Sequence, residues 1–184
     1  MPDGQKNLFW SDFARFVIIS ILVIVPIRAW VAQPFIVRGA SMEPTFHDSE
    51  YLIIDELSYE LRKPERGEVI VFRFPEDTTK FFIKRVIGLP GETIEIRDNK
   101  VFLITDGEEK ELKESYLSEP LTAPGSLTRL GEKEYLVLGD NRLFSSDSRR
   151  WGALQENLII GRAWLRLWPP GRINFLPGLN RFQI

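Results

Sequence analysis

The longest apolar stretch of the chain lies near the amino terminus, where FVIISILVIVPI covers Phe16–Ile27 without a charged residue. Twelve residues give about 18 Å of helix, which falls short of the roughly 30 Å of a hydrocarbon core. Trp10 and Trp30 widen the segment to roughly 30 Å, at the spacing of an aromatic belt. Arg15 and Arg28 stand near its ends, where long cationic side chains can reach lipid headgroups.

This pattern predicts one transmembrane helix over residues 13–32, after a short tail over residues 1–12. Two other interpretations stay open. One is the hydrophobic region of a cleaved signal peptide, with a poor cleavage site near residues 27–29, and the other is a buried helix of a soluble domain. Two basic residues precede the apolar run and one follows it, which favours a cytoplasmic amino terminus and an exported body.

The rest of the chain, residues 33–184, alternates short apolar runs with turn signals. The runs expected to be strands are Tyr51–Ile54, Glu68–Phe74, Phe81–Ile87, Thr93–Arg97, Lys100–Thr105, Glu134–Leu138 and Ala163–Trp168. Alternation on both sides of Asp98-Asn99 predicts a hairpin there. Helical periodicity is weak, and Leu154–Ile160 is its best candidate. The pattern predicts a mainly β domain of antiparallel sheets, with residues 105–133 as a small polar insertion.

Composition removes several classes of function. The chain has 24 Lys+Arg against 26 Asp+Glu, and a net charge of −2 argues against a nucleic-acid partner. Cysteine is absent, which excludes disulfide scaffolds, cysteine-based zinc sites and cysteine nucleophiles. His47 is the single histidine, so we expect neither a metal site nor another cofactor.

One predicted strand carries two cations. In FFIKRVI, Phe81–Ile87, alternation places Lys84 and Arg85 on opposite faces, and both faces are otherwise apolar. A lysine buried there would be driven toward its neutral amine, which makes Lys84 a candidate general base. Arg85 would stay protonated and need a carboxylate partner. In the alternative interpretation, both side chains reach solvent from an edge strand.

The segment QPFIVRGASMEPTF at residues 33–46 contains a candidate nucleophile, Ser41. Gly39 lets a backbone approach closely, although a serine in such a place is ordinarily a turn or capping residue. A serine nucleophile needs a base, either His47 or a lysine. His47 follows Ser41 by six residues, too close for triad geometry, so we expect it at the surface. A third polar segment, GDNRLFSSDSRR at residues 139–150, is equally compatible with a hydrogen-bonded loop.

Together and in this order, these segments resemble the type I signal peptidases, which are membrane-anchored Ser-Lys proteases. After the apolar anchor, the matching motifs are GASMEPT at 39–45, RGEVIVF at 66–72, IKRVIGLPGE at 83–92, GDNR at 139–142 and S-x-DSR at 145–149. A single motif of this kind would be weak support. The ordered set covers nearly the whole chain and is specific.

The resemblance implies roles for particular side chains. Ser41 would attack the scissile carbonyl, and neutral Lys84 would take its proton. Ser145 would lie beside Lys84 and fix the amine by a hydrogen bond, while the Ser41 backbone N–H would stabilise the oxyanion. Gly39 stands where some members carry a serine that completes the oxyanion hole. The implied supporting residues are Arg85 paired with Asp140, Asp147 paired with Arg149, and Gly139, which leaves room beside the lysine.

The implied substrates are preproteins that emerge from an export channel and are cut after small residues at positions −1 and −3. The family binds the signal peptide as an added β-strand. The positions that match its two shallow pockets are Phe35, Val37, Met42, Phe82 and Ile83. An apolar surface that includes Trp164 and Trp168 would rest on the lipid bilayer. This implies a single-pass protein of the cell membrane, with the catalytic domain on the outer face.

One departure from the family pattern concerns the third polar segment. Leu143-Phe144 replaces small polar residues, and this pair would either contact lipid or distort the loop that carries Ser145. Three alternatives to the peptidase stay open: a catalytically silent, membrane-anchored β-domain that acts as a binding module, a self-cleaving repressor with the same dyad, and a secreted binder released near Ala29.

Overall fold

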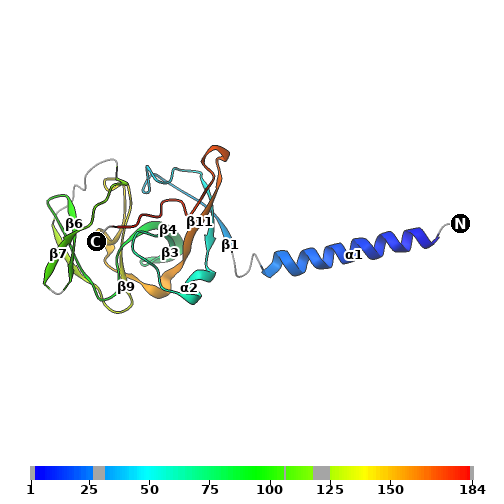
Figure 1. The fold of residues 1–184 in the computed structure, drawn as a ribbon, viewed down its shortest axis with the longest axis horizontal. Coiled ribbons are helices and arrows are strands. Elements are labelled where there is room, and N and C mark those ends of the chain that lie inside the picture. The colour runs from blue at the N-terminus through cyan, green and yellow to red at the C-terminus, as the bar shows by residue number, and fades with distance from the viewer. Residues whose placement is uncertain (1–2, 27–31, 106, 118–124, 183–184) are drawn as a thin grey trace.

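The computed structural model describes residues 3–26, 32–105, 107–117 and 125–182, which form a long amino-terminal helix and a β domain (Figure 1). An eight-stranded sheet has the order β1-β2-β11-β3-β4-β9-β10, with β12 added beside β11, and a four-stranded sheet has the order β7-β6-β5-β8. The strands are β1 (Ala32–Ile36), β2 (Tyr51–Asp55), β3 (Val69–Phe74), β4 (Asp77–Gly88), β5 (Thr93–Arg97), β6 (Lys100–Thr105), β7 (Glu108–Glu111), β8 (Ser126–Arg129), β9 (Glu134–Leu138), β10 (Leu154–Gln155), β11 (Ile159–Trp168) and β12 (Asn174–Phe175). Every described strand pair is antiparallel, which confirms the predicted mainly β class.

Most of the expected strands form close to their predicted bounds, and two are longer because pairing extends beyond the apolar run. β4 begins at Asp77, and β11 begins at Ile159. The predicted hairpin turns at Asp98 and Asn99, whose positive φ values of 49° and 61° suit a tight turn between twisted strands. The helical candidate was wrong: residues 154–160 form β10, a short 3₁₀ turn over Glu156–Leu158 and the start of β11.

The predicted polar insertion supplies two strands of the four-stranded sheet, β7 and β8. β7 extends the β5–β6 hairpin on one side and β8 on the other. Residues 106 and 118–124 of the insertion lie outside the described part of the chain. A buried apolar cluster that includes Ile87, Ile94 and Leu136 joins the two sheets.

Three helices complete the described residues: α1 (Asp3–Pro26), α2 (Leu57–Leu61) and α3 (Ser148–Trp151), together with 3₁₀ turns. α1 extends away from the β domain (Figure 1). Over the described residues, no helix is both long enough and apolar enough to span a bilayer. The transmembrane helix predicted over residues 13–32 includes residues 27–31, which are outside the described ranges.

β4 is the strand that positions the candidate site. It pairs with β3 from Asp77 to Arg85, but with β9 only from Arg85 to Gly88. The first part of β4 therefore has one edge without a described partner. β1 stands at the end of the eight-stranded sheet, and its outer edge is likewise free among the described residues. Segments from these two edges, residues 35–38 and 81–84, line one cavity.

Candidate active site

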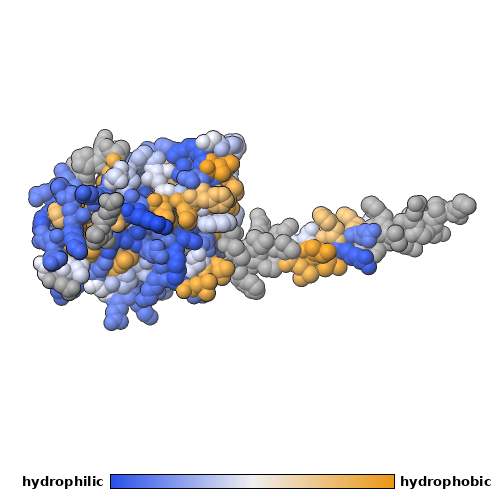
Figure 2. Space-filling model, viewed as in Figure 1, coloured by the Kyte–Doolittle hydropathy of each residue, from blue (hydrophilic) through white to orange (hydrophobic). Residues whose placement is uncertain are grey.

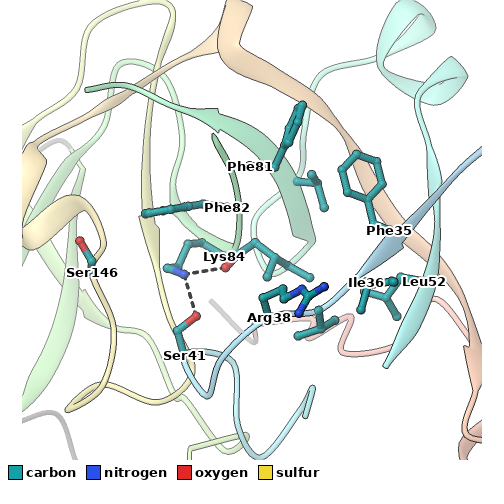
Figure 3. A pocket seen from close by; sticks show the side chains of 12 residues that line it. Phe35, Ile36, Arg38, Ser41, Leu52, Phe81, Phe82, Lys84 and Ser146 are labelled. Atoms are coloured by element: carbon teal, nitrogen blue, oxygen red, sulfur yellow. Dashed lines mark hydrogen bonds between the residues drawn. The ribbon is translucent and has the colours of Figure 1, made fainter. Parts of the chain in front are cut away.

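The structure brings Ser41 and Lys84 into direct contact across 43 residues of sequence. Ser41 lies in the turn after β1, and Lys84 points toward it from β4 (Figure 3). Lys84 Nζ is 2.8 Å from Ser41 Oγ and 2.8 Å from the Ile83 carbonyl oxygen, to which it donates. A serine hydroxyl and a lysine amine at this distance can exchange a proton.

The surroundings of Lys84 favour its neutral form. Its side chain is 3% exposed, and Nζ lies 5.3 Å from the centre of the Phe82 ring. Burial lowers the pKa of Lys84 to about 8, while the negative charges of Asp147 and Asp140 oppose that shift. Lys84 is therefore available as a neutral amine at mildly alkaline pH.

Arg85, on the opposite face of β4, is fully buried and paired. Its Nε donates to Asp140 Oδ1 at 2.8 Å, and its Nη2 donates to Asp140 Oδ2 at 2.6 Å. The guanidinium also donates to the Gly67 and Gly178 carbonyls, so the buried charge is well satisfied. Thr45 donates its hydroxyl proton to the same Asp140 carboxylate, which links the Ser41 turn to this ion pair.

The loop between β9 and α3 packs directly against the Ser41 turn. Asn141 N–H donates to the Ser41 carbonyl at 3.1 Å. A Cβ atom on Gly139 would lie 2.2 Å from Ser145 Oγ and 2.5 Å from the Ser41 carbonyl oxygen, so this close approach requires glycine.

Asp147 holds this loop from inside. It is fully buried and accepts hydrogen bonds from Arg149 Nε and Nη2, both at 2.7 Å, and from the Gly139 N–H at 3.0 Å. Burial by itself would raise the pKa of Asp147, but the hydrogen bonds and positive charge of Arg149 outweigh it and hold the pKa below its usual value. Asp147 therefore stays ionised and fixes the backbone at Gly139.

Sequence reasoning missed a buried ion pair that joins the insertion to the same loop. Arg142 Nη1 donates to Glu114 Oε2 at 2.8 Å, and Arg142 Nε donates to the Gly139 carbonyl at 3.0 Å. The centre of the Tyr116 ring, two residues after Glu114, lies 4.0 Å from the Arg85 guanidinium carbon. Nothing in the polar pattern of the insertion indicated that Glu114 faces inward.

Ser145 lacks the hydrogen bond to Lys84 that the resemblance implies, and its buried hydroxyl has no hydrogen-bond partner among the described residues. It lies against Gly139. The neighbouring Ser146, which the sequence did not single out, lines the cavity with Ser41 and Lys84. Leu143 and Phe144 are 52% and 74% exposed, so both side chains point away from the loop interior.

The cavity beside Ser41 has a volume of about 280 Å³ and mostly apolar walls. Four of the five predicted pocket residues line it, namely Phe35, Val37, Phe82 and Ile83. Met42 does not line this cavity, because it is 1% exposed and packs in the core with Phe46 and Val69. The lining residues that sequence reasoning missed are Ile36, Arg38, Leu52, Val71, Phe81 and Ser146.

His47 is not among the residues that line the cavity. The His47 ring lies 3.4 Å from Glu43 Oε1, and both side chains are more than a third exposed. Gly39 N–H donates to Asp48 Oδ1 at 2.7 Å, which fixes the backbone just before Ser41. Within the described ranges, no group of three His, Asp or Glu side chains is placed to hold a metal ion.

Comparison with known proteins gives a consistent result. The family model described as "Signal peptidase, peptidase S26" matches residues 10–168. A probable signal peptidase I-2 of Synechocystis sp. is 37% identical over 173 residues, which are 91% of this chain and 77% of that protein. Signal peptidase I of Bacillus amyloliquefaciens is 32% identical over 177 residues, covering 90% of this chain and 88% of that protein.

Two further proteins are similar to this chain. The chloroplastic thylakoidal processing peptidase 1 of Arabidopsis thaliana is 32% identical over 178 residues, which are 89% of this chain and 50% of that protein. A crystal structure of a signal peptidase I from Enterococcus faecalis is 32% identical, with a TM-score of 0.48, and covers 55% of this chain and 97% of that chain.

Proposed function

The chain belongs to the signal peptidase family, peptidase S26, and we propose that Ser41 and Lys84 are its catalytic dyad. Membership makes it a serine endopeptidase that acts in the removal of signal peptides. The observation that carries the proposal is the 2.8 Å contact between the Ser41 hydroxyl and the amine of a buried lysine.

The proposed reaction passes through an acyl-enzyme. Neutral Lys84 takes the proton of Ser41 Oγ as this oxygen attacks the scissile carbonyl, and the Ser41 backbone N–H donates to the oxyanion. The Lys84 ammonium then gives its proton to the departing amine, and the peptide C–N bond breaks. A water molecule next loses a proton to Lys84 and attacks the acyl carbon. The ester C–O bond then breaks, and the Lys84 ammonium returns this proton to Ser41 Oγ, which releases the peptide acid and restores both residues.

We propose that the surrounding ion pairs hold Ser41 and Lys84 in the correct relative position. Arg85–Asp140 ties β4 to the loop that begins at Gly139, and Asp147 holds that loop with Arg149. Ser145 belongs to the same support, because it fills the space that Gly139 leaves. Precise placement of the dyad matters, since a shift of about 1 Å can cost two orders of magnitude in rate.

Substrate binding follows from the free strand edges. The proposed signal peptide adds as a β-strand along β1, and main-chain hydrogen bonds supply affinity. Side chains of an added strand alternate between faces, so the residues at −1 and −3 point together into the cavity beside Ser41. The apolar walls at Phe35, Val37, Phe82 and Ile83 leave about 280 Å³ and favour small residues at both positions.

Signal peptidases are membrane-associated proteins in general, and we propose that this chain works at the surface of the cell membrane. Large apolar side chains lie side by side in the sheet at Ile36, Tyr51 and Trp168, and each is more than 40% exposed. Figure 2 shows hydrophobic surface at the end of the domain that faces α1 and on part of the coloured middle of α1. We propose residues 13–32 as the anchor and 33–184 as the peptidase domain on the outer face, where an export channel delivers preproteins.

Cleavage of a preprotein with an Ala-x-Ala site tests the dyad. Purified full-length protein in detergent should cut after the second alanine, and Ser41→Ala should not, because the attacking oxygen is removed. Ser126→Ala, which removes an exposed hydroxyl on β8 in the other sheet, serves as the matched control and should cut normally. Equal cleavage by the Ser41→Ala variant would remove Ser41 from the mechanism. Absence of cleavage by every folded variant would favour the silent binding module.

The rate of cleavage should depend on pH through Lys84. Only its neutral form can accept the Ser41 proton, and the pKa of Lys84 is about 8. We therefore expect kcat/KM to rise about tenfold per pH unit below this value and to level off above it. The measurement is a kcat/KM profile with a peptide substrate that has no ionisable side chain. A flat profile across this range would contradict the assignment of Lys84 as base.

A further inference from the structure

One side chain at the solvent-exposed edge of the active-site cavity carries a permanent charge that the proposed reaction does not use. Arg38 and Lys84 are the two described lining residues with basic side chains, and an arginine stays protonated at any physiological pH. In Figure 3 the Arg38 guanidinium is drawn among the lining side chains, between Ser41 and Ile36. Arg38 is exposed to solvent, whereas the remaining walls of the cavity are mostly apolar.

Arg38 has no ion-pair partner within 4.0 Å among the residues that the structure describes. The acidic group that senses its charge is Asp48, whose pKa is lowered chiefly by the Gly39 N–H, with smaller contributions from Ser49 and Arg38. Both Asp48 oxygens are already occupied: Oδ1 accepts from Gly39 N–H at 2.7 Å, and Oδ2 accepts from the Ser49 hydroxyl at 2.8 Å. No hydrogen bond of the Arg38 guanidinium occurs among the described residues either, so its donors are available to an incoming carboxylate.

The register of β1 indicates which substrate side chain would meet Arg38. The hydrogen-bond ladder between β1 and β2 continues beyond the ends of these strands. Val37 N–H donates to the Glu50 carbonyl, and the Val37 carbonyl accepts from Ser49 N–H, both at 2.9 Å. Along this extended segment, Val37 is buried, whereas Ile36 and Arg38 are exposed. Arg38 therefore lies on the outward face of the strand and borders the cavity at its exposed edge, whereas the buried Val37 lies on the opposite face.

A peptide added beside β1 follows the same alternation. If its −1 and −3 side chains enter the cavity, its −2 side chain points to the outward face, on which Arg38 lies. We propose that Arg38 makes this peptidase prefer substrates with an acidic side chain at −2, between the two small residues. The inference rests on the proposed function, because it presumes cleavage at an Ala-x-Ala site.

Two peptides that differ only in Glu or Gln at −2 give the test. Wild-type protein should show a kcat/KM for the Glu peptide that exceeds that for the Gln peptide by about three- to tenfold at low ionic strength. Arg38→Gln should bring the ratio close to one, and Arg38→Glu should invert it. The matched control is Arg129→Gln, an exposed arginine on β8 in the other sheet, which should keep the wild-type ratio. At about 1 M salt, where the Debye length is about 3 Å, the wild-type preference should shrink.

The outcomes separate this inference from the proposed function. If wild-type protein cuts neither peptide, the proposed function fails and the inference fails with it. If both peptides are cut and the ratio is one, or is unchanged in Arg38→Gln, the dyad stands and the inference is overturned. If Arg38→Gln slows both peptides equally, and only on vesicles with anionic lipid, the cation contacts the membrane surface and the inference is likewise overturned.

Discussion

Replacement of Lys84 by arginine should abolish cleavage while the protein remains folded. Arginine keeps a positive charge but cannot become a neutral base, so the Ser41 proton has no acceptor. Loss of a positioned general base reduces rates by about 10²- to 10⁴-fold, which is the expected loss in kcat/KM. The measurement is peptide cleavage at a pH above the pKa of Lys84, together with circular dichroism and thermal unfolding to establish the fold.

A larger guanidinium in a site that is 3% exposed could also disturb packing, so a second variant is needed. Lys84→Met keeps the length and removes both the charge and the amine, and it should be equally inactive with an intact fold. Lys80→Arg is the matched control, because Lys80 lies on the same strand, is 65% exposed and pairs with Asp77. Wild-type turnover by a folded Lys84→Met protein would show that another group removes the Ser41 proton.

The second large effect is expected on stability, from Asp140→Asn. This change leaves Arg85 fully buried without its counter-charge, and breaking a buried ion pair from one side typically costs 3–5 kcal/mol, so we expect a loss of about 4 kcal/mol in the free energy of unfolding. Urea denaturation followed by tryptophan fluorescence measures it. Asp77→Asn breaks a partly exposed pair with Lys80 on β4, the strand that carries Arg85, and should leave the denaturation midpoint close to that of wild type.

Replacing both partners tests the reason for that loss. Arg85→Met with Asp140→Leu removes both charges, and such apolar replacements are often close to neutral for stability. We expect the double variant to unfold at a higher urea concentration than Asp140→Asn, although with the site disturbed. If the free energy of unfolding of Asp140→Asn equals that of wild type, the prediction is wrong. The hydrogen bonds from Arg85 to the Gly67 and Gly178 carbonyls then suffice to stabilise the guanidinium.

The alternation of FFIKRVI predicted correctly that Lys84 and Arg85 would lie on opposite, buried faces of one strand. This is possible because the side-chain period of a strand is set by local geometry. The contact between residues 41 and 84 depends on sheet order, which places β1 and β4 at two facing edges, and no local pattern specifies that order. The resemblance to a family, rather than any periodicity, brought these two residues together in the sequence analysis.

The polar residues of the loop after β9 show where sequence reasoning stops. Its hydroxyl and acidic side chains are all compatible with a surface turn, and which of them point inward is decided by long-range partners. Asp147 turns inward because Arg149 and the Gly139 N–H satisfy it. Ser145 and Ser146 differ by one residue in an irregular segment, where no period assigns one of them to the cavity. The inward-facing Glu114 was missed for the same reason, since its partner Arg142 lies 28 residues away.

The free edges of β1 and β4 have a consequence for the breadth of the substrate set. Every polypeptide carries the same main-chain donors and acceptors, so a strand that docks by its backbone is recognised largely without reference to its sequence. Such an enzyme can process many unrelated exported proteins with one small cavity and needs no separate binding site for each. Discrimination between substrates must then come from the few residues around the scissile bond. A change at a few residues that line the cavity can therefore alter which of the substrates are cleaved.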